Sequence, residues 1–328
     1  MRPLPAVMLL TLFLACNSPV SAEVPPGPPT LTLEARIGDG AWSQEPAVHP
    51  LKGEAVALRV AQQPGAEPRW YQIFPDLDQM YKNANHPWED DPYEWVGLDS
   101  IRYLRVERTD LRGQWEVQPL VHPGRHPERS RFHQLDVGSS WYQVELHTQG
   151  GVAISPGLES NDARGLSPDV MRVSVRDGEG YIGWLSSFFN VPGLFGSVVQ
   201  QSSGYVGVDC ADVLVAAWHR WKGKPLAKNY NVAMLVELWP RVLELDLDGG
   251  QPAEPVAWGE QVRPGDILAV RYADQKQYQH IGALYQDADG DGQLGGEDLV
   301  LHAGPWPLQT ARLDRGGFDG HVVVMRPE

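Results

Sequence analysis

Cysteine is scarce in this chain of 328 residues, which contains only Cys16 and Cys210. Basic residues are also in deficit, because 27 lysines and arginines face 42 aspartates and glutamates, giving a formal charge of −15. Such an acidic surface repels phosphate backbones and anionic membrane surfaces, so we expect no nucleic acid partner. Apart from the N-terminal segment, no apolar run approaches the length of a membrane span.

What remains is a globular composition, with 42% hydrophobic and 21% charged residues. The length suits two domains better than one. A Pro-rich tether at 23–30 precedes them, and the turn cluster from Asp177 to Gly180 predicts their boundary. We therefore expect domains at 31–177 and 178–328.

The first 22 residues have the pattern of a signal peptide, with Arg2 before a short apolar run at 6–15. Cleavage before Cys16, in Phe13-Leu14-Ala15-Cys16, predicts a bacterial lipoprotein anchored through Cys16. Cleavage after Ala22 predicts a secreted or periplasmic protein instead. In both cases the protein is exported, as a periplasmic or outer-membrane lipoprotein or in secreted form. Cys210 is then left without a disulfide partner in the chain, as a buried hydrophobe or a reactive group.

Short β-like runs separated by turn residues fill the first domain and predict an all-β, sandwich-like fold. They lie at 31–37, 55–60, 70–74, 101–107, 115–121, 141–147 and 170–176. The second domain begins with predicted helices at 181–189, 210–221 and 231–243. Predicted strands at 267–271, 280–285, 299–302 and 321–324 follow, which is an α+β order.

Cys210 follows Asp209, a good N-cap, so we expect the thiol at the first turn of a helix. The helix dipole and the free backbone N–H groups there favour a thiolate and can hold an oxyanion. The alternative is a packed core cysteine.

A nucleophilic thiolate needs a histidine base. His219 lies nine residues after Cys210, and at about 100° per residue this places it on the opposite helix face. His280 opens one predicted strand and His302 ends the next, so a hairpin would bring the two together. We predict Cys210 as nucleophile, His280 as base and His302 as the group that orients it, against the alternative of ordinary strand histidines.

Three motifs together resemble the NlpC/P60 family of cell-wall cysteine peptidases over about 181–326. They are Val-Asp-Cys-Ala-Asp-Val at 208–213, Arg-Pro-Gly-Asp-Ile-Leu at 263–268 with His-Ile-Gly-Ala-Leu-Tyr at 280–285, and Leu-His-Ala at 301–303. The resemblance implies an α+β papain-like C-terminal domain and the same roles for Cys210, His280 and His302. Two departures are Ala211-Asp212 in place of Ser-Gly, and the absence of the family's tyrosine from 192–196.

Between the two histidines lies an acidic segment at 287–298 with the spacing of a calcium loop. Its positions 1, 3, 5, 7 and 12 are Asp287, Asp289, Asp291, Gln293 and Asp298. Because its flanks read as strands, we expect a structural Ca²⁺ that stabilises a β-hairpin. A solvated acidic turn is the alternative.

These features lead us to expect a cell-envelope cysteine peptidase that hydrolyses peptide bonds in the stem peptides of peptidoglycan, or in another peptide substrate. The altered motif keeps open an amidase, an acyltransferase or a transglutaminase-like enzyme. A catalytically inactive envelope binding protein is the third interpretation.

Overall fold

The computed structural model describes residues 31–120, 130–162 and 164–328. The predicted signal peptide at 1–22, the tether at 23–30 and the lipid acceptor Cys16 lie outside the described residues. Within the described residues, no helix combines the length and the apolar composition needed to cross a membrane.

The N-terminal part consists of two sheets that enclose a common core. One has the order β1-β3-β7, formed by Leu33–Ile37, Val56–Val60 and Glu116–Val117. The other has the order β2-β12-β8-β4-β6, formed by Ala47–Val48, Met171–Val175, Gly138–Thr148, Glu67–Pro75 and Tyr103–Glu107, with β9 (Gly151–Ile154) paired to β8. Alternating side chains such as Leu33 and Ala35 point inward and meet Val144 of the facing sheet.

Short elements join this part to the rest of the chain. Strand β5 (Tyr81–Lys82) pairs in parallel with β13 (Leu194–Phe195), across the predicted domain boundary. The hairpin of β10 (Asn161–Asp162) and β11 (Gly165–Leu166) precedes β12. The 3₁₀ turns are Thr109–Leu111, Leu158–Ser160 and Leu313–Arg315.

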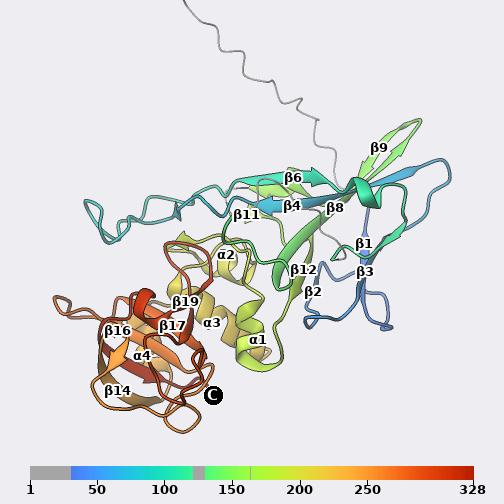
Figure 1. The fold of residues 1–328 in the computed structure, drawn as a ribbon. Coiled ribbons are helices and arrows are strands. Elements are labelled where there is room, and N and C mark those ends of the chain that lie inside the picture. The colour runs from blue at the N-terminus through green and yellow to red at the C-terminus, as the bar shows by residue number, and fades with distance from the viewer. Residues whose placement is uncertain (1–30, 121–129, 163) are drawn as a thin grey trace, which may run out of the picture.

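The helices are short, apart from one. Helix α3 (Cys210–Trp221) is accompanied by α1 (Gly180–Ser186), α2 (Val199–Ser203) and α4 (Val232–Leu238). The Asp209 carboxylate caps α3 by accepting from the amides of Ala211 and Asp212 at 3.0 and 2.8 Å. The helix packs between the two parts of the chain, because its Leu214 shares a core with Trp141 of β8 and Ile281 of β17 (Figure 1).

A curled seven-stranded antiparallel sheet forms most of the C-terminal part. Its order is β15-β14-β20-β16-β17-β18-β19, formed by Gln251–Pro252, Arg241–Asp248, Gly320–Met325, Ile267–Arg271, His280–Gln286, Leu299–His302 and Gln309–Arg312. Both faces are buried. Ile267 and Ala269 of β16 face α3, whereas Leu268 and Val270 face a second core that contains Phe318.

The expected α+β papain-like fold is therefore wrong, because the chain is mostly β, with 36% strand and 14% helix. The predicted helix at 231–243 fails at Pro240, which lacks a backbone donor and restricts the residue before it. Helix α4 ends at Leu238, and the alternating Arg-Val-Leu-Glu-Leu-Asp-Leu-Asp that follows forms strand β14.

Candidate active site

Cys210 occupies the first position of α3 and is partly exposed. The loop that follows β18 lies directly against it. A Cβ atom on Gly304 would stand 3.5 Å from the Cys210 nitrogen and 3.7 Å from its Cβ. Gly304 has a φ of +86°, a backbone conformation that residues with side chains rarely adopt, and a Cβ there would touch Cys210 at ordinary van der Waals distance.

His280 and His302 are hydrogen-bonded to each other across the hairpin of β17 and β18. His280 Nε2 lies 3.0 Å from His302 Nδ1, and the two rings meet edge to face. The Phe318 ring packs against both imidazoles. Its centroid lies 5.1 Å from that of the His280 ring and 6.0 Å from that of the His302 ring. His302 is 8% exposed. Because β18 leads from His302 to Gly304, the paired histidines and Cys210 lie at the same end of strands β17 and β18.

Tyr272 is a further member of this group that sequence reasoning did not identify. Its hydroxyl donates to the Gly317 carbonyl at 2.9 Å. A Cβ on Gly317 would lie 3.5 Å from the Tyr272 hydroxyl and 4.0 Å from His280 Cδ2, so the phenol is close to the imidazole. Burial raises the pKa of Tyr272, and the nearby Cys210 charge raises it further. The sequence signal was weak, a lone tyrosine just after a strand.

Burial shifts the pKa values of the thiol and of both imidazoles in the direction that favours their neutral forms. Burial raises the pKa of the Cys210 thiol, and the carboxylates of Asp209 and Asp212 add to the shift. Burial lowers the pKa of His280 to about 3, with a smaller contribution from His302. Burial alone lowers the pKa of His302 to about 4. The direction of this shift is opposite to the low thiol pKa expected from the sequence, because burial and the two neighbouring carboxyl groups both disfavour the thiolate.

The predicted oxyanion donors are also reduced in number. The amides of Ala211 and Asp212 already donate to Asp209, so the Cys210 amide is the first-turn donor that remains beside the thiol. Asp212 is 2% exposed and accepts a short hydrogen bond from the Ser197 hydroxyl. Burial raises the pKa of Asp212 well above its ordinary value, and the Asp209 charge raises it further.

His219 lies near the end of α3, where its ring contacts Trp218 and Tyr230. It lines a separate cavity at that end of the helix and not the surroundings of Cys210. The structure therefore agrees with the helix-face argument that set His219 aside.

Three residues of the predicted calcium loop gather at one point. Asp287, Asp289 and Asp291 each offer a carboxylate oxygen, and these oxygens lie within 4.8 Å of one another. Asp287 also accepts from the amides of Gly290 and Gly292, which closes the turn. Carboxylates at this spacing suit a hard cation such as Ca²⁺.

The carboxylate of Asp298 is not part of that group. Asp298 is 1% exposed, and its oxygens accept from the Trp258 indole at 2.8 Å and from the amides of Ala288 and Gly295 at 3.1 and 2.7 Å. The backbone N–H of Gln293 donates to Oδ1 of Asp291 at 2.7 Å. Asp298 therefore fixes the end of the loop by hydrogen bonding, whereas the sequence predicted a ligand at position 12.

An aromatic loop between β5 and β6 reaches the same edge of the C-terminal sheet (Figure 1). Its Tyr93 hydroxyl donates to the side chain of Gln279 at 3.2 Å, directly before His280. Trp88, Tyr93 and Trp95 are 63%, 57% and 54% exposed, which is unusual for such large apolar side chains. The sequence signal for this loop was the mixture of acidic and aromatic residues at 87–95. That pattern did not indicate which part of the fold the loop contacts.

Comparison of the chain with protein-family models, with curated proteins and with solved structures finds no match.

Proposed function

We propose that the chain is a cysteine hydrolase that cleaves amide bonds, with Cys210 as nucleophile, His280 as base and His302 as orienting group. The observation that carries the proposal is the hydrogen bond between His280 and His302. It lies at the end of strands β17 and β18 where the following Gly304 is next to Cys210, the first residue of α3. A nucleophile, a base and a third group that fixes the base make up the minimum for acyl transfer.

The pairing of the histidines assigns the nitrogens. His280 Nε2 is engaged by His302 Nδ1, so His280 Nδ1 is the atom that takes the thiol proton. The sulfur then attacks the carbonyl carbon, and the Cys210 amide donates to the oxyanion. Protonated His280 passes its proton to the leaving amine as the C–N bond breaks. Water, deprotonated by His280, releases the acid from the thioester and restores the thiol.

The resting charges make this a general-base mechanism. A thiol with a raised pKa beside an imidazole with a pKa of about 3 keeps its proton until a substrate is present. Proton transfer then accompanies attack on the carbonyl, and the substrate oxyanion carries the developing charge.

The proposed substrate is a peptide of the bacterial cell envelope, in the first instance a peptidoglycan stem peptide. The NlpC/P60-like motifs and the export signal support this class. The exposed ring of Tyr93, held next to His280 through Gln279, supplies an aromatic surface against which a peptide or glycan can pack.

The carboxylates of Asp287, Asp289 and Asp291 would hold Ca²⁺ as a structural ion. The loop joins the strand that begins with His280 to the strand that ends with His302. A bound cation would supply charge neutralisation at the turn and so keep the register on which the histidine pair depends.

The test is digestion of purified sacculi, followed by mass spectrometry of the soluble fragments. Wild-type protein should release fragments cut at a single type of amide bond, and Cys210→Ala should release none. Cys210→Ala is isolated and folded in the same way, so it controls for contaminating hydrolases. Equal release by both proteins would contradict the proposal.

A second function is favoured by one observation. The raised pKa of Cys210 suits an inert thiol in an envelope binding protein. That function predicts that wild type and Cys210→Ala retain sacculi equally and that neither cuts them. Transfer of an acyl group to an added amine, in place of hydrolysis, would instead indicate an acyltransferase or a transglutaminase-like enzyme.

A further inference from the structure

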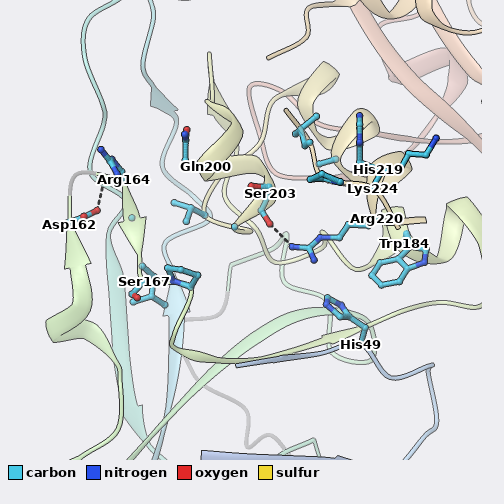
Figure 2. A pocket seen from close by; sticks show the side chains of 18 of the residues that line it. His49, Asp162, Arg164, Ser167, Trp184, Gln200, Ser203, His219, Arg220 and Lys224 are labelled. Atoms are coloured by element: carbon cyan, nitrogen blue, oxygen red, sulfur yellow. Dashed lines mark hydrogen bonds between the residues drawn. The ribbon is translucent and has the colours of Figure 1, made fainter. Parts of the chain in front are cut away.

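A cavity of about 940 Å³ lies at the C-terminal end of α3, at the opposite end of that helix from Cys210. The helix has 12 residues, so the two ends are about 18 Å apart. One wall comes from the β10–β11 hairpin and the other from α2 and the turn after α3 (Figure 2). The cavity is therefore separate from the candidate active site and is lined by both parts of the chain.

The charge of this cavity is opposite to that of the whole molecule. Its lining includes the cations Arg164, Arg220 and Lys224, and Asp162 is the one carboxylate among the lining residues. The ion pairs formed within 31–120, 130–162 and 164–328 involve none of these three cations. In a chain with a formal charge of −15, a cavity lined by three cations and one carboxylate has a local excess of positive charge that is suited to an external anion.

The arginines behind the wall strengthen the local positive field. Arg172 is 6% exposed, donates to the Gly204 carbonyl at 2.9 Å and lies over the Tyr205 ring, as Arg220 does from another side. Burial lowers the pKa of His49 to about 3, and the charges of Arg172 and Arg220 lower it further. Nδ1 of His49 is shielded from solvent and has no hydrogen-bond partner among the described residues.

The remaining lining combines apolar side chains with neutral polar ones such as Ser167, Gln200 and Ser203. Leu166, Val206 and Leu226 line the cavity, and Trp184 stands beside His49 with 4.9 Å between ring centroids. Figure 2 shows Arg164 on one side and Arg220 with Lys224 on the other, with the Trp184 and His49 rings at one end. Cavities of several hundred cubic ångströms with apolar walls and a few convergent polar groups are typical of sites for small organic molecules.

We propose that this cavity binds an organic phosphate. The phosphoryl group would lie beside Arg220, whose guanidinium donates to the Ser203 carbonyl at 2.8 Å, and the exposed charges of Arg164 and Lys224 on the facing walls would add to the attraction for the anion. The organic part would pack against Leu166, Val206 and Trp184. The proposal does not depend on the hydrolase, and such a ligand would join the two walls of the cavity.

The experiment is isothermal titration calorimetry on the full-length protein at fixed ionic strength, with three probes. Phenyl phosphate carries both the phosphoryl group and an apolar ring, inorganic phosphate lacks the ring, and benzoate replaces the phosphoryl group by a carboxylate. We expect saturable one-site binding of phenyl phosphate, and weaker binding of each of the other two probes. Failure of phenyl phosphate to bind saturably, or benzoate binding as tightly, would overturn the proposal.

The site is located by a charge-matched pair of variants. Arg164 and Lys224 are exposed, so Arg164→Gln with Lys224→Gln should leave the fold and melting temperature unchanged while weakening phenyl phosphate about tenfold or more. Arg315→Gln with Lys276→Gln removes the same charge from exposed positions outside the cavity and should leave binding unchanged. Equal weakening by both double variants would show a general charge effect and would contradict a site in the cavity.

Discussion

His280 Nε2 and His302 Nδ1 lie 3.0 Å apart, so one imidazole must donate its proton to the other. The contact joins the first residue of β17 to the last residue of β18 and leaves Nδ1 as the nitrogen of His280 that His302 does not engage. Within the described residues the His280 side chain is hydrogen-bonded to a second histidine and to no carboxylate, so it can accept a proton but gains no electrostatic stabilisation from a charged partner. This distinguishes the pair from a histidine held by a carboxylate.

The first prediction concerns the three proposed catalytic residues. Cys210→Ala should abolish hydrolysis, and His280→Ala should be nearly as damaging, because the base and the nucleophile act as one unit. The double variant should be little worse than either single one. His302→Ala should retain more activity, because His302 orients the base and exchanges no proton in the cycle.

The measurement is kcat/KM on the fragments released from sacculi. His302→Gln is the matched variant, because its side chain can still meet His280 Nε2, and it should recover part of the activity lost in His302→Ala. His219→Ala is the control at the far end of α3. A larger loss in His219→Ala than in His280→Ala would contradict the assignment of the base.

The second prediction follows from the raised pKa of Cys210. The rate of alkylation by iodoacetamide should rise continuously from pH 6 to pH 9.5, without the plateau that a preformed thiolate shows. Asp209→Asn keeps an N-capping oxygen but removes a charge beside the thiol, so it should lower the pKa and speed alkylation at pH 8. Asp209→Ala removes the cap as well and should cost ~1 kcal/mol of stability. A plateau below pH 7 in the wild type would restore the thiolate expected from the sequence.

The third prediction concerns stability in acid. His49, His280 and His302 have pKa values lowered to about 3, 3 and 4, so in the folded state they stay neutral where the unfolded chain takes up protons. Stability should therefore be undiminished above pH 6.5 and should fall as the pH drops toward 4, by up to ~1.4 kcal/mol per pH unit for each histidine. Urea unfolding between pH 4 and 8 measures this. His49→Gln should flatten part of the slope without altering hydrolysis, and an unchanged slope would contradict the assignment.

Local patterns predicted the parts of this structure that depend on neighbouring residues. Spacing along the chain predicted the strands near 280–285 and 299–302 and the cap on α3. It also predicted that His219 lies on α3 away from Cys210. The helix expected at 231–243 failed because Pro240 divides two segments, and the second has the period of a strand. An apolar window that crosses a proline does not show this by its composition alone.

The electrostatics of Cys210 could not be read from the sequence. The motif shows Asp209 and Asp212 beside the cysteine, but whether they shift its pKa depends on burial, and that is set by packing of α3 against β17 and β8. The hydrogen bonds of Asp298 could not be predicted for a related reason, because the Trp258 indole that donates to its carboxylate comes from a segment 40 residues earlier. The positions of Tyr272, Gly304 and Tyr93 could not be predicted either. These residues lie in segments that are far apart in the sequence and that only the folded chain brings near His280 or Cys210.

The last prediction concerns calcium. The oxygens of Asp287, Asp289 and Asp291 converge within 4.8 Å, and without a cation three carboxylates at that spacing repel one another. Because Asp298 is held by the protein itself, the loop offers fewer charged ligands than a full calcium loop, and we expect a Kd of ~10⁻⁴ to 10⁻³ M. At 5 mM Ca²⁺ the ion should then stabilise the fold by ~1–2 kcal/mol and raise the melting temperature by a few degrees. Activity should follow, because the turn sets the register of the strands that carry His280 and His302.

Asp287→Asn with Asp289→Asn removes the repulsion and the ion together, so the melting temperature of this double variant should no longer respond to calcium or to chelator. Asp274→Asn with Glu254→Gln, at exposed positions away from the loop, should respond as the wild type does. Equal melting temperatures of the wild type in chelator and in 5 mM Ca²⁺ would reduce the loop to an acidic turn.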